Sequence, residues 1–165
     1  MRLWHHRSMS VTRATTHLDR NGIRYRSHAY ELPAEPDRSY GEAVAGVLGL
    51  EPARVFKTLV AVVDGDPVGA IVPVDRSLRL KELAVVRGGK RAAMADPADA
   101  ERLTGYVSGG ISPFGQRRRL PTVIDAPALE RETICVSGGR RGLQVEVAPA
   151  DLVADLGAAA APIGG

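Results

Sequence analysis

The stretch VFKTLVAVV at residues 55–63 is followed by DGDP at 64–67 and by a second apolar run, VGAIVPV, at 68–74. Valine-rich runs of this length favour β-strands, and an Asp-Gly pair between two such runs is typical of a hairpin turn. Residues 55–74 therefore predict an antiparallel β-hairpin.

Helix and strand patterns alternate irregularly on both sides of this hairpin. Before it, we expect a helix over 12–21, a strand over 23–30, a loop over 31–38 and a helix that begins with the capping-box pair Ser39 and Glu42 and ends before Gly49. After it, we expect helices over 80–87, over 97–104 between an Asp96 N-cap and Gly105, and over 149–156, with strands over 122–124, 133–136 and 143–147. Strands outnumber helices and no regular strand-helix repeat occurs, which predicts a single-domain α+β fold with a mixed, curved or barrel-like sheet flanked by helices.

The composition is that of a water-soluble domain with an aliphatic core. Of 165 residues, 44% are hydrophobic but only 4% are aromatic, so leucine, valine and alanine must fill the interior. A single cysteine excludes an internal disulfide, and no apolar run has the length of a membrane span. The first residues lack the pattern of a secretory signal, so we expect a cytoplasmic protein without membrane partners. A net charge of +3 permits phosphate contacts without establishing them.

Lys57 places a charge within an otherwise apolar strand. Strand alternation puts its side chain on the same face as Leu59 and Ala61. One interpretation is an edge-strand lysine whose alkyl stem packs while its ammonium reaches water. The other is a pocket in which an anionic or ester-bearing ligand meets the cation, because a buried ammonium is costly without such a partner.

Residues 105–116, GYVSGGISPFGQ, are rich in glycine and contain one proline. Glycine lets main-chain amides approach a ligand closely, and proline restricts where the loop bends. The segment GGISP at 109–113 is therefore a candidate backbone cradle for an anionic or carbonyl oxygen. The alternative is a tight turn between strands.

Side-chain nucleophiles and metal ligands have little support in the sequence. Ser112 has no histidine or acid near it in the chain, and the four histidines fall at positions 5, 6, 17 and 28, which disfavours a Ser-His-Asp arrangement. Cys135 lies within a strand pattern without a local cation, so a buried thiol is favoured over a catalytic one. One cysteine and scattered histidines provide no zinc spacing, and no nucleotide-binding fingerprint is complete. We therefore expect neither a metal nor a cofactor.

Blocks spread along the chain resemble the YbaK/EbsC family of free-standing aminoacyl-tRNA editing domains, relatives of the domain inserted in bacterial prolyl-tRNA synthetases. The blocks are VFKTL at 55–59, MADPA at 94–98, the glycine loop at 105–116, LPTVID at 120–125, VSGGRRGL at 136–143 and EVAPADL at 146–152. Their order and spacing cover about residues 10–157, so the resemblance is more specific than any one motif. The greatest similarity is to the Cys-tRNA(Pro) deacylases.

This resemblance implies a mixed β-barrel flanked by helices, with Lys57 and Gly109 as catalytic residues at the substrate ester. It implies substrate-binding roles for Tyr30, Tyr40, Thr58, Gly110, Ile111, Ser112, Pro113, Ser137 and Gly139. Apart from the resemblance, the two tyrosines are equally well interpreted as packed aromatics, and Ser137 and Gly139 as part of a hairpin turn. Gln144 departs from the pattern, because some cysteine-specific relatives carry an aspartate there.

The resemblance also implies an activity, the removal of mischarged cysteine from tRNA(Pro), in which the thiol of the esterified cysteine attacks its own carbonyl and leaves as a cyclic thiolactone. One alternative is a deacylase of the same family that uses water against alanine or serine. Another is a non-catalytic protein that binds tRNA or a synthetase and keeps the pocket.

The partners expected on this basis are the 3′ end of an aminoacyl-tRNA and prolyl-tRNA synthetase. The basic clusters 117–119 and 140–141 flank the two glycine-rich segments and are either phosphate contacts or a solvated rim. For the chain as a whole, we expect a disordered extension at 1–9, the editing domain at 10–157 and a flexible tail at 158–165, with Met1 or Met9 as the natural start.

Overall fold

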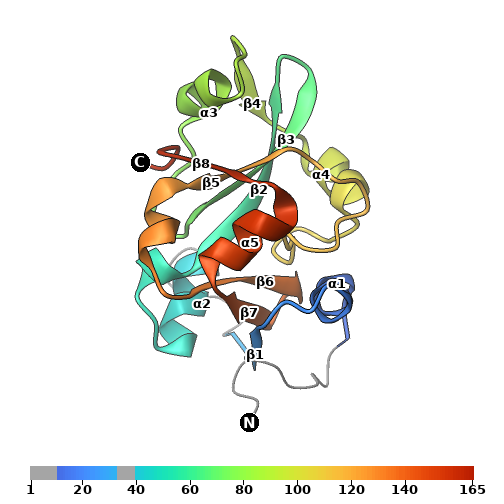
Figure 1. Ribbon diagram of the computed structural model, residues 1–165, viewed down its shortest axis with the longest axis vertical. Helices are drawn as coiled ribbons and strands as arrows, with labels where there is room; N and C mark the ends of the chain where they lie inside the picture. The colour runs from blue at the N-terminus through green and yellow to red at the C-terminus, as the bar shows by residue number, and fades with distance from the viewer. Residues whose placement is uncertain (1–10, 33–39) are drawn as a thin grey trace.

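The computed structural model describes residues 11–32 and 40–165. The expected extension at 1–9, most of the loop at 31–38 and Ser39 of the predicted capping box lie outside the described residues. Within them, five α-helices and eight strands form one α+β domain with two sheets, as Figure 1 shows. The predicted fold class is confirmed.

The larger sheet is built around the predicted hairpin. Its strand order is β4 (Ala92–Met94), β2 (Phe56–Val63), β3 (Asp66–Pro73), β5 (Thr122–Asp125) and β8 (Ala159–Ala161). Val63 pairs with Asp66 across the turn, and Asp64 and Gly65 both adopt positive φ, 48° and 89°, as a two-residue hairpin turn of type I′ requires. The strand β4 was not expected, because it has only three residues, Ala-Ala-Met, which is too short for a strand pattern to show in the sequence.

The smaller sheet is antiparallel, with β7 (Leu143–Val147) between β1 (Arg26–Ala29) and β6 (Ile134–Arg140). It meets the larger sheet at an isolated parallel bridge between Val55 and Cys135. The described residues therefore form two sheets in contact, and the closed barrel implied by the family resemblance is wrong. Because β2 reaches β6 only at its first residues, the start of β2 lies against the smaller sheet and its end extends away from it.

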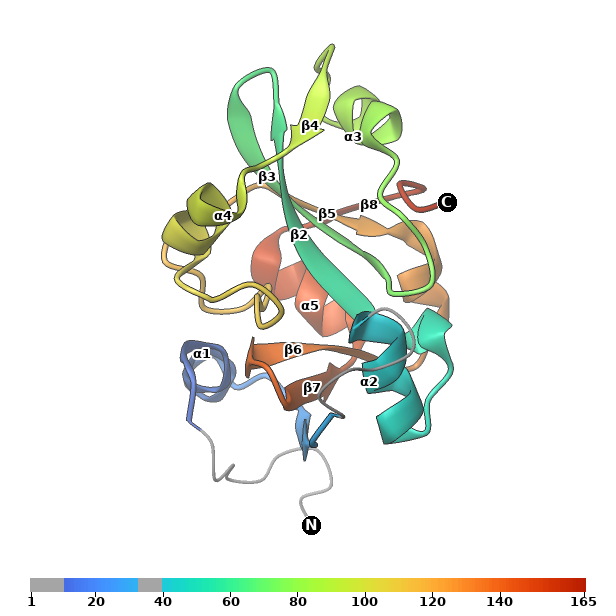
Figure 2. The same ribbon diagram turned by 180° about the vertical axis from the view of Figure 1, so that it is seen from behind.

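Five helices cover the two sheets. They are α1 (Arg13–Arg20), α2 (Tyr40–Leu48), α3 (Leu80–Val86), α4 (Pro97–Thr104) and α5 (Pro149–Leu156), joined by the 3₁₀ turns η1 (Pro52–Arg54) and η2 (Ala126–Glu130). Both α4 and α5 begin with a proline and end at a left-handed glycine, Gly105 or Gly157. Asp96 precedes α4 as expected but its side chain makes no capping hydrogen bond. The helix α5 lies between the sheets on one face, and α2 and α4 flank β2 on the other (Figures 1 and 2).

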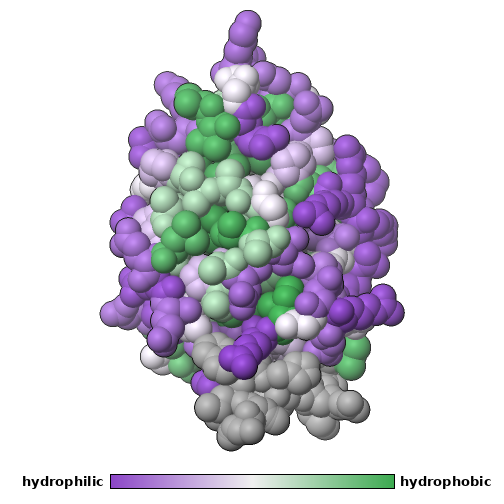
Figure 3. Space-filling model, viewed as in Figure 1, coloured by the Kyte–Doolittle hydropathy of each residue, from purple (hydrophilic) through white to green (hydrophobic). Residues whose placement is uncertain are grey.

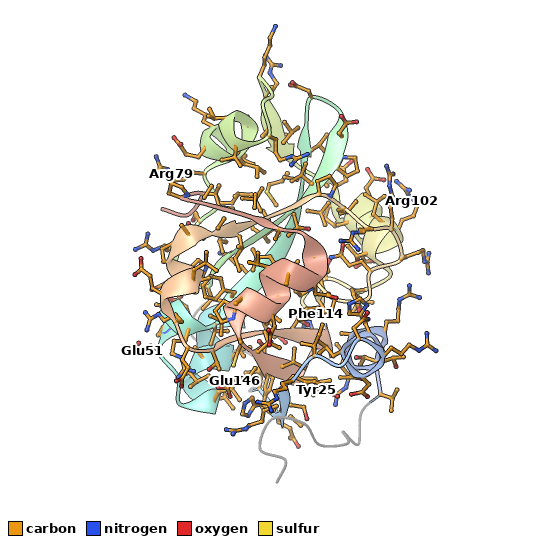
Figure 4. The ribbon with its side chains drawn as sticks, in the orientation of Figure 1. Tyr25, Glu51, Arg79, Arg102, Phe114 and Glu146 are labelled. Carbon is orange, nitrogen blue, oxygen red and sulfur yellow. The ribbon has the colours of Figure 1, made fainter. Side chains whose placement is uncertain are left out.

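The main core lies between the two sheets and the helices α1 and α5. Phe114, from the glycine loop, is fully buried there with Leu18 and Leu152, and its ring stacks on His17 of α1 with centroids 6.0 Å apart. Figure 4 shows Phe114 between α1 and α5. The loop that carries the candidate cradle is thus anchored in the core by its aromatic residue.

The segment at 158–165, expected as a flexible tail, packs against the larger sheet in its central part. The strand β8 runs parallel to β5, Ile163 is fully buried, and the carboxylate of Asp125 accepts the amides of Ile163 and Gly164 at 3.0 and 3.1 Å. Small side chains gave no strand signal, but backbone pairing holds this segment independently of side-chain size.

Alanine-rich segments also shape the surface. On the face seen in Figure 3, hydrophobic residues follow one another from α3 across β8 to α5, with hydrophilic residues on both sides.

Within the described part of the chain, every helix is too short or too polar to cross a lipid bilayer.

Candidate active site

A cavity of about 480 Å³ is lined by the first half of β2 and by residues of α2 and α4. Figure 2 shows these two helices on the same side of β2. The five consecutive residues from Phe56 to Val60 form its base. Its walls come from elements distant in sequence: Tyr40, Gly41 and Val44 of α2, Val55 and Val74 beside the hairpin, Met94, Ala95, Pro97 and Ala100 around α4, Ser108, Gly109 and Ile111 of the glycine loop, and Ser137 and Gln144 of the smaller sheet. A mostly apolar hollow with a few convergent polar groups is the usual form of a small-ligand site.

Lys57 supplies the cavity with its cation. Its side chain is half-buried, and within residues 11–32 and 40–165 its ammonium has no hydrogen bond or ion pair. Burial lowers the pKa of Lys57 below its ordinary value, while the negative charges of Glu42 and Asp75 oppose the shift. The structure therefore places a partly desolvated positive charge where a ligand can meet it.

Two buried polar atoms in the same cavity lack partners. The hydroxyl oxygen of Thr58 and the side-chain carbonyl oxygen of Gln144 make no hydrogen bond with any described residue, although these residues are only 8% and 6% exposed. Most buried polar atoms in proteins are paired, because an unpaired one costs about 1–3 kcal/mol. Both residues line the cavity, so these oxygens are candidate acceptors for a ligand that carries hydrogen-bond donors.

Tyr40 lines the cavity and forms a hydrogen-bonded pair with Tyr30. Their hydroxyl oxygens are 3.4 Å apart, and the side-chain amide of Gln144 donates to the hydroxyl of Tyr30 at 3.4 Å. Tyr40 lines the cavity, whereas Tyr30 lies behind Gln144. Burial and the hydrogen bond with Tyr40 raise the pKa of Tyr30. Tyr30 is therefore a neutral hydroxyl that orients Gln144.

The glycine loop brings main-chain amides to the cavity, as the sequence predicts, but not all of them are available. The amide of Gly110 donates to the carbonyl of Val107 at 2.9 Å and closes a turn. The amides of Gly109 and Ile111, whose residues both line the cavity, have no acceptor within the described chain. Gly109 adopts a positive φ of 86°, a conformation that favours glycine.

Two predicted members of the cradle point elsewhere. Ser112 is fully buried and its hydroxyl accepts the amide of Phe114 at 3.2 Å, so it neither lines the cavity nor is accessible for attack. Pro113 borders a different hollow beside His17 and Asp155. Contrary to expectation, the cavity uses only the first part of the glycine-proline motif, because Phe114 fixes the second part in the core.

The β6 edge of the cavity contributes Ser137. Ser137 lines the cavity and its hydroxyl accepts the amide of Gly139 at 3.1 Å. Gly139 itself faces Thr12 and Tyr106, where a β-carbon would come within 3.1 Å of both side chains, and it does not line the cavity. Its role in this structure is close packing against α1.

Cys135 belongs to a hydrogen-bonded cluster below the cavity. His28, Cys135 and Glu146 place one possible metal-ligand atom each within 4.8 Å of one another. However, Glu146 is already engaged by His28 at 2.9 Å, Thr133 at 2.6 Å and Arg54 at 3.5 Å. Burial raises the pKa of the Cys135 thiol to about 12, and a neutral thiol is neither a good nucleophile nor a good metal ligand. A salt-bridge network explains this cluster without a metal, since Arg54 already supplies the positive charge.

The structure thus brings Lys57, Thr58, Tyr40, Gly109, Ile111 and Ser137 together and leaves Tyr30, Gly110, Ser112, Pro113 and Gly139 behind or outside the cavity. Residues that line the cavity but were not proposed for the site include Met94, Ala95 and Pro97. They belong to the MADPA block at 94–98, which is part of the family resemblance. The block could therefore have pointed to the site, but its apolar side chains suggest no catalytic or binding chemistry by themselves.

Comparisons with known proteins find relatives that cover most of the chain. Residues 35–154 match the family described as the aminoacyl-tRNA editing domain. A protein of Enterococcus faecalis assigned as a Cys-tRNA(Pro)/Cys-tRNA(Cys) deacylase, EbsC, is 38% identical over 144 residues, 87% of each chain. The multifunctional Ser/Thr-tRNA deacylase ProXp-y of Escherichia coli is 36% identical over 115 residues, 67% of this chain and 69% of that protein.

A solved structure shows the same fold. The crystal structure of a protein assigned as a trans-editing enzyme for prolyl-tRNA synthetase superposes with a TM-score of 0.81 and 26% identity, over 96% of this chain and 99% of that one.

Proposed function

Because this chain belongs to the aminoacyl-tRNA editing domain family, we propose that it is a trans-acting deacylase that removes mischarged cysteine from tRNA(Pro) in the cytoplasm. The observation that carries the proposal is a single cavity lined by Lys57, Gly109 and Ile111, whose ammonium and two main-chain amides have no partner among the described residues. Cleavage of an ester develops negative charge on its carbonyl oxygen, which such donors stabilise. A relative assigned as a Cys-tRNA(Pro)/Cys-tRNA(Cys) deacylase supports the choice of cysteine.

The proposed reaction needs no nucleophile from the protein. The sulfur of the esterified cysteine forms a bond to its own carbonyl carbon, the carbon–oxygen bond to the ribose breaks, and the thiol proton passes to the ribose oxygen. The products are tRNA and a cyclic thiolactone. The amides of Gly109 and Ile111 and the ammonium of Lys57 stabilise the oxyanion, and the apolar walls hold the thiol near the carbonyl. This agrees with the burial of Ser112 and Cys135, which leaves both side chains unexposed.

A second candidate is a deacylase for serine that uses water. It is favoured by the unpaired oxygens of Thr58 and Gln144, since a serine hydroxyl donates a stronger hydrogen bond than a thiol does. The relative named as a Ser/Thr-tRNA deacylase points in the same direction.

A panel of substrates separates these candidates. With tRNA(Pro) charged with cysteine, serine or alanine, we expect cysteine to be released at least about tenfold faster than the others, a difference of about 1.4 kcal/mol in barrier height. Alkylation of the substrate thiol should abolish release. Persistent release from the alkylated substrate, or equal rates with serine, would show attack by water. Tight binding without any turnover would instead identify a non-catalytic binding protein.

Prolyl-tRNA synthetase is the proposed transient partner, since the similar crystal structure is that of a protein assigned as a trans-editing enzyme for this synthetase. A chain of this size, with a net charge of +3, has a weak general attraction for nucleic acid and gains selectivity if a synthetase presents the tRNA. We expect the tagged protein to retain prolyl-tRNA synthetase on a column when tRNA(Pro) is present. Retention equal to that of an unrelated synthetase would contradict the proposal.

A further inference from the structure

Arg141, in the turn between β6 and β7, lies at the mouth of the cavity. The centre of its guanidinium is 4.9 Å from the ring centroid of Tyr40. On its other side it approaches the glycine loop, where a β-carbon on Gly109 would be 3.0 Å from its Nη2 atom and 3.1 Å from Cζ. Arg141 is therefore held between two residues that line the cavity, although it comes from a strand connection distant from both in sequence.

The charge of Arg141 has no acidic partner among residues 11–32 and 40–165. The residue is exposed, and within the described parts of the chain its guanidinium pairs with no carboxylate. Stacking on Tyr40 and contact with the loop restrict the side chain, so that little rotational freedom remains to be lost on binding a ligand. A fixed, solvent-facing guanidinium with free donors suits a phosphate group, which arginine binds through two parallel hydrogen bonds.

The contact of this cation with Gly109, a residue that lines the cavity, indicates which phosphate it meets. In an aminoacyl-tRNA the ester lies on the ribose of the terminal adenosine, and the phosphate on the 5′ side of that ribose is the first negative charge outside the ester. With the ester carbonyl at Lys57, Gly109 and Ile111, this phosphate must leave the cavity at its mouth. We infer that Arg141 binds the 5′-phosphate of the aminoacylated terminal adenosine. This assignment deepens the function proposed above and rests on it.

Substrates with and without that phosphate test the assignment. The rates of wild type and Arg141→Ala are compared on three substrates that carry the amino acid as an ester on the ribose. These are aminoacyl-tRNA, adenosine 5′-monophosphate aminoacylated on its ribose, and adenosine aminoacylated on its ribose. We expect Arg141→Ala to raise KM by about tenfold for the two phosphate-bearing substrates and to change the phosphate-free substrate by less than about twofold. Arg141→Lys, which keeps the charge but loses the planar fork, should fall between.

The matched control is Arg87→Ala, which removes the same charge at the end of α3, beside a separate hollow at the hairpin turn. It should leave all three rates unchanged. If Arg141→Ala slows all three substrates equally, Arg141 orders the glycine loop and the inference is overturned. If it slows none of them, the inference is also overturned.

A binding measurement separates this inference from the proposed activity. By calorimetry, wild type should bind adenosine 5′-monophosphate about tenfold more tightly than adenosine, and Arg141→Ala should bind both alike. Inactivity of wild type on every ester would refute the deacylase proposal while leaving this phosphate preference measurable. Equal binding of adenosine 5′-monophosphate and adenosine by wild type would refute the phosphate site.

Discussion

Replacing Lys57 by alanine is expected to reduce kcat/KM for deacylation by about 100-fold or more, the typical effect of removing one group that stabilises an oxyanion. The ammonium is partly desolvated and has no hydrogen bond or ion pair with the described residues. In such surroundings a charge interacts more strongly with a developing oxyanion than it does in water. The measurement is single-turnover release of cysteine from Cys-tRNA(Pro), with Lys81→Ala on the exposed side of α3 as the matched control.

The same substitution distinguishes a catalytic role from a structural one. Since burial lowers the pKa of Lys57, the folded state disfavours the charged form, and Lys57→Met should unfold at the same temperature as wild type or a higher one. A large fall in the unfolding temperature would mean that Lys57 supports the fold, which would remove the reason to assign it to catalysis.

The sign of the pH dependence follows from this lowered pKa. As pH rises from the folded-state pKa of Lys57 towards its ordinary value of 10.5, the unfolded chain binds more protons than the folded one, so wild type gains stability relative to Lys57→Met. Activity should change in the opposite direction, because the ammonium loses its proton in the same range. Chemical unfolding and deacylation, measured from pH 7 to 10 with uncatalysed ester hydrolysis subtracted, check both trends.

Short sequence motifs correctly predicted the hairpin turn and the helix ends, which depend on neighbouring residues in the chain. Asp64 and Gly65 determined the hairpin and its register, because few residue pairs tolerate two positive φ angles in succession. Proline at the start and glycine at the end likewise located α4 and α5. Pairing partners could not be predicted in this way: β8 joins the sheet through backbone hydrogen bonds to β5, and nothing in a run of alanines specifies that neighbour.

The candidate site shows the same division. A lone charge on a hydrophobic strand marked Lys57, and the glycine-proline spacing marked the loop. Neither pattern indicates which amides remain unpaired, and that depends on the turn made by Gly110 and on the anchoring of Phe114. Gln144 departs from the pattern of some relatives, but the sequence does not indicate that its amide nitrogen donates to Tyr30 while its carbonyl oxygen has no partner among the described residues.

Gly110→Ala is the second change with a large expected effect. A β-carbon on Gly110 would lie 2.8 Å from Cα and 2.9 Å from C of Arg140, and 3.0 Å from the nitrogen of Arg141. These are backbone atoms that cannot rotate away, so the glycine loop must separate from the turn between β6 and β7. Overpacking of this kind costs about 1–3 kcal/mol. The unfolding temperature should therefore fall by about 3–10 °C for a chain of this length.

This separation should impair function as well as stability, because the loop and the turn carry Gly109 and Arg141 on opposite sides of the same contact. We expect kcat/KM on Cys-tRNA(Pro) to fall by about tenfold or more, since small displacements of oxyanion donors are costly. Gly46→Ala makes the same chemical change at an exposed site in α2, where alanine favours the helix by about 0.5–1 kcal/mol. That variant should remain fully active. If Gly110→Ala matched it in both stability and rate, the loop and the turn would not need their close contact, and a cavity mouth formed by Gly109 and Arg141 would lose its physical basis.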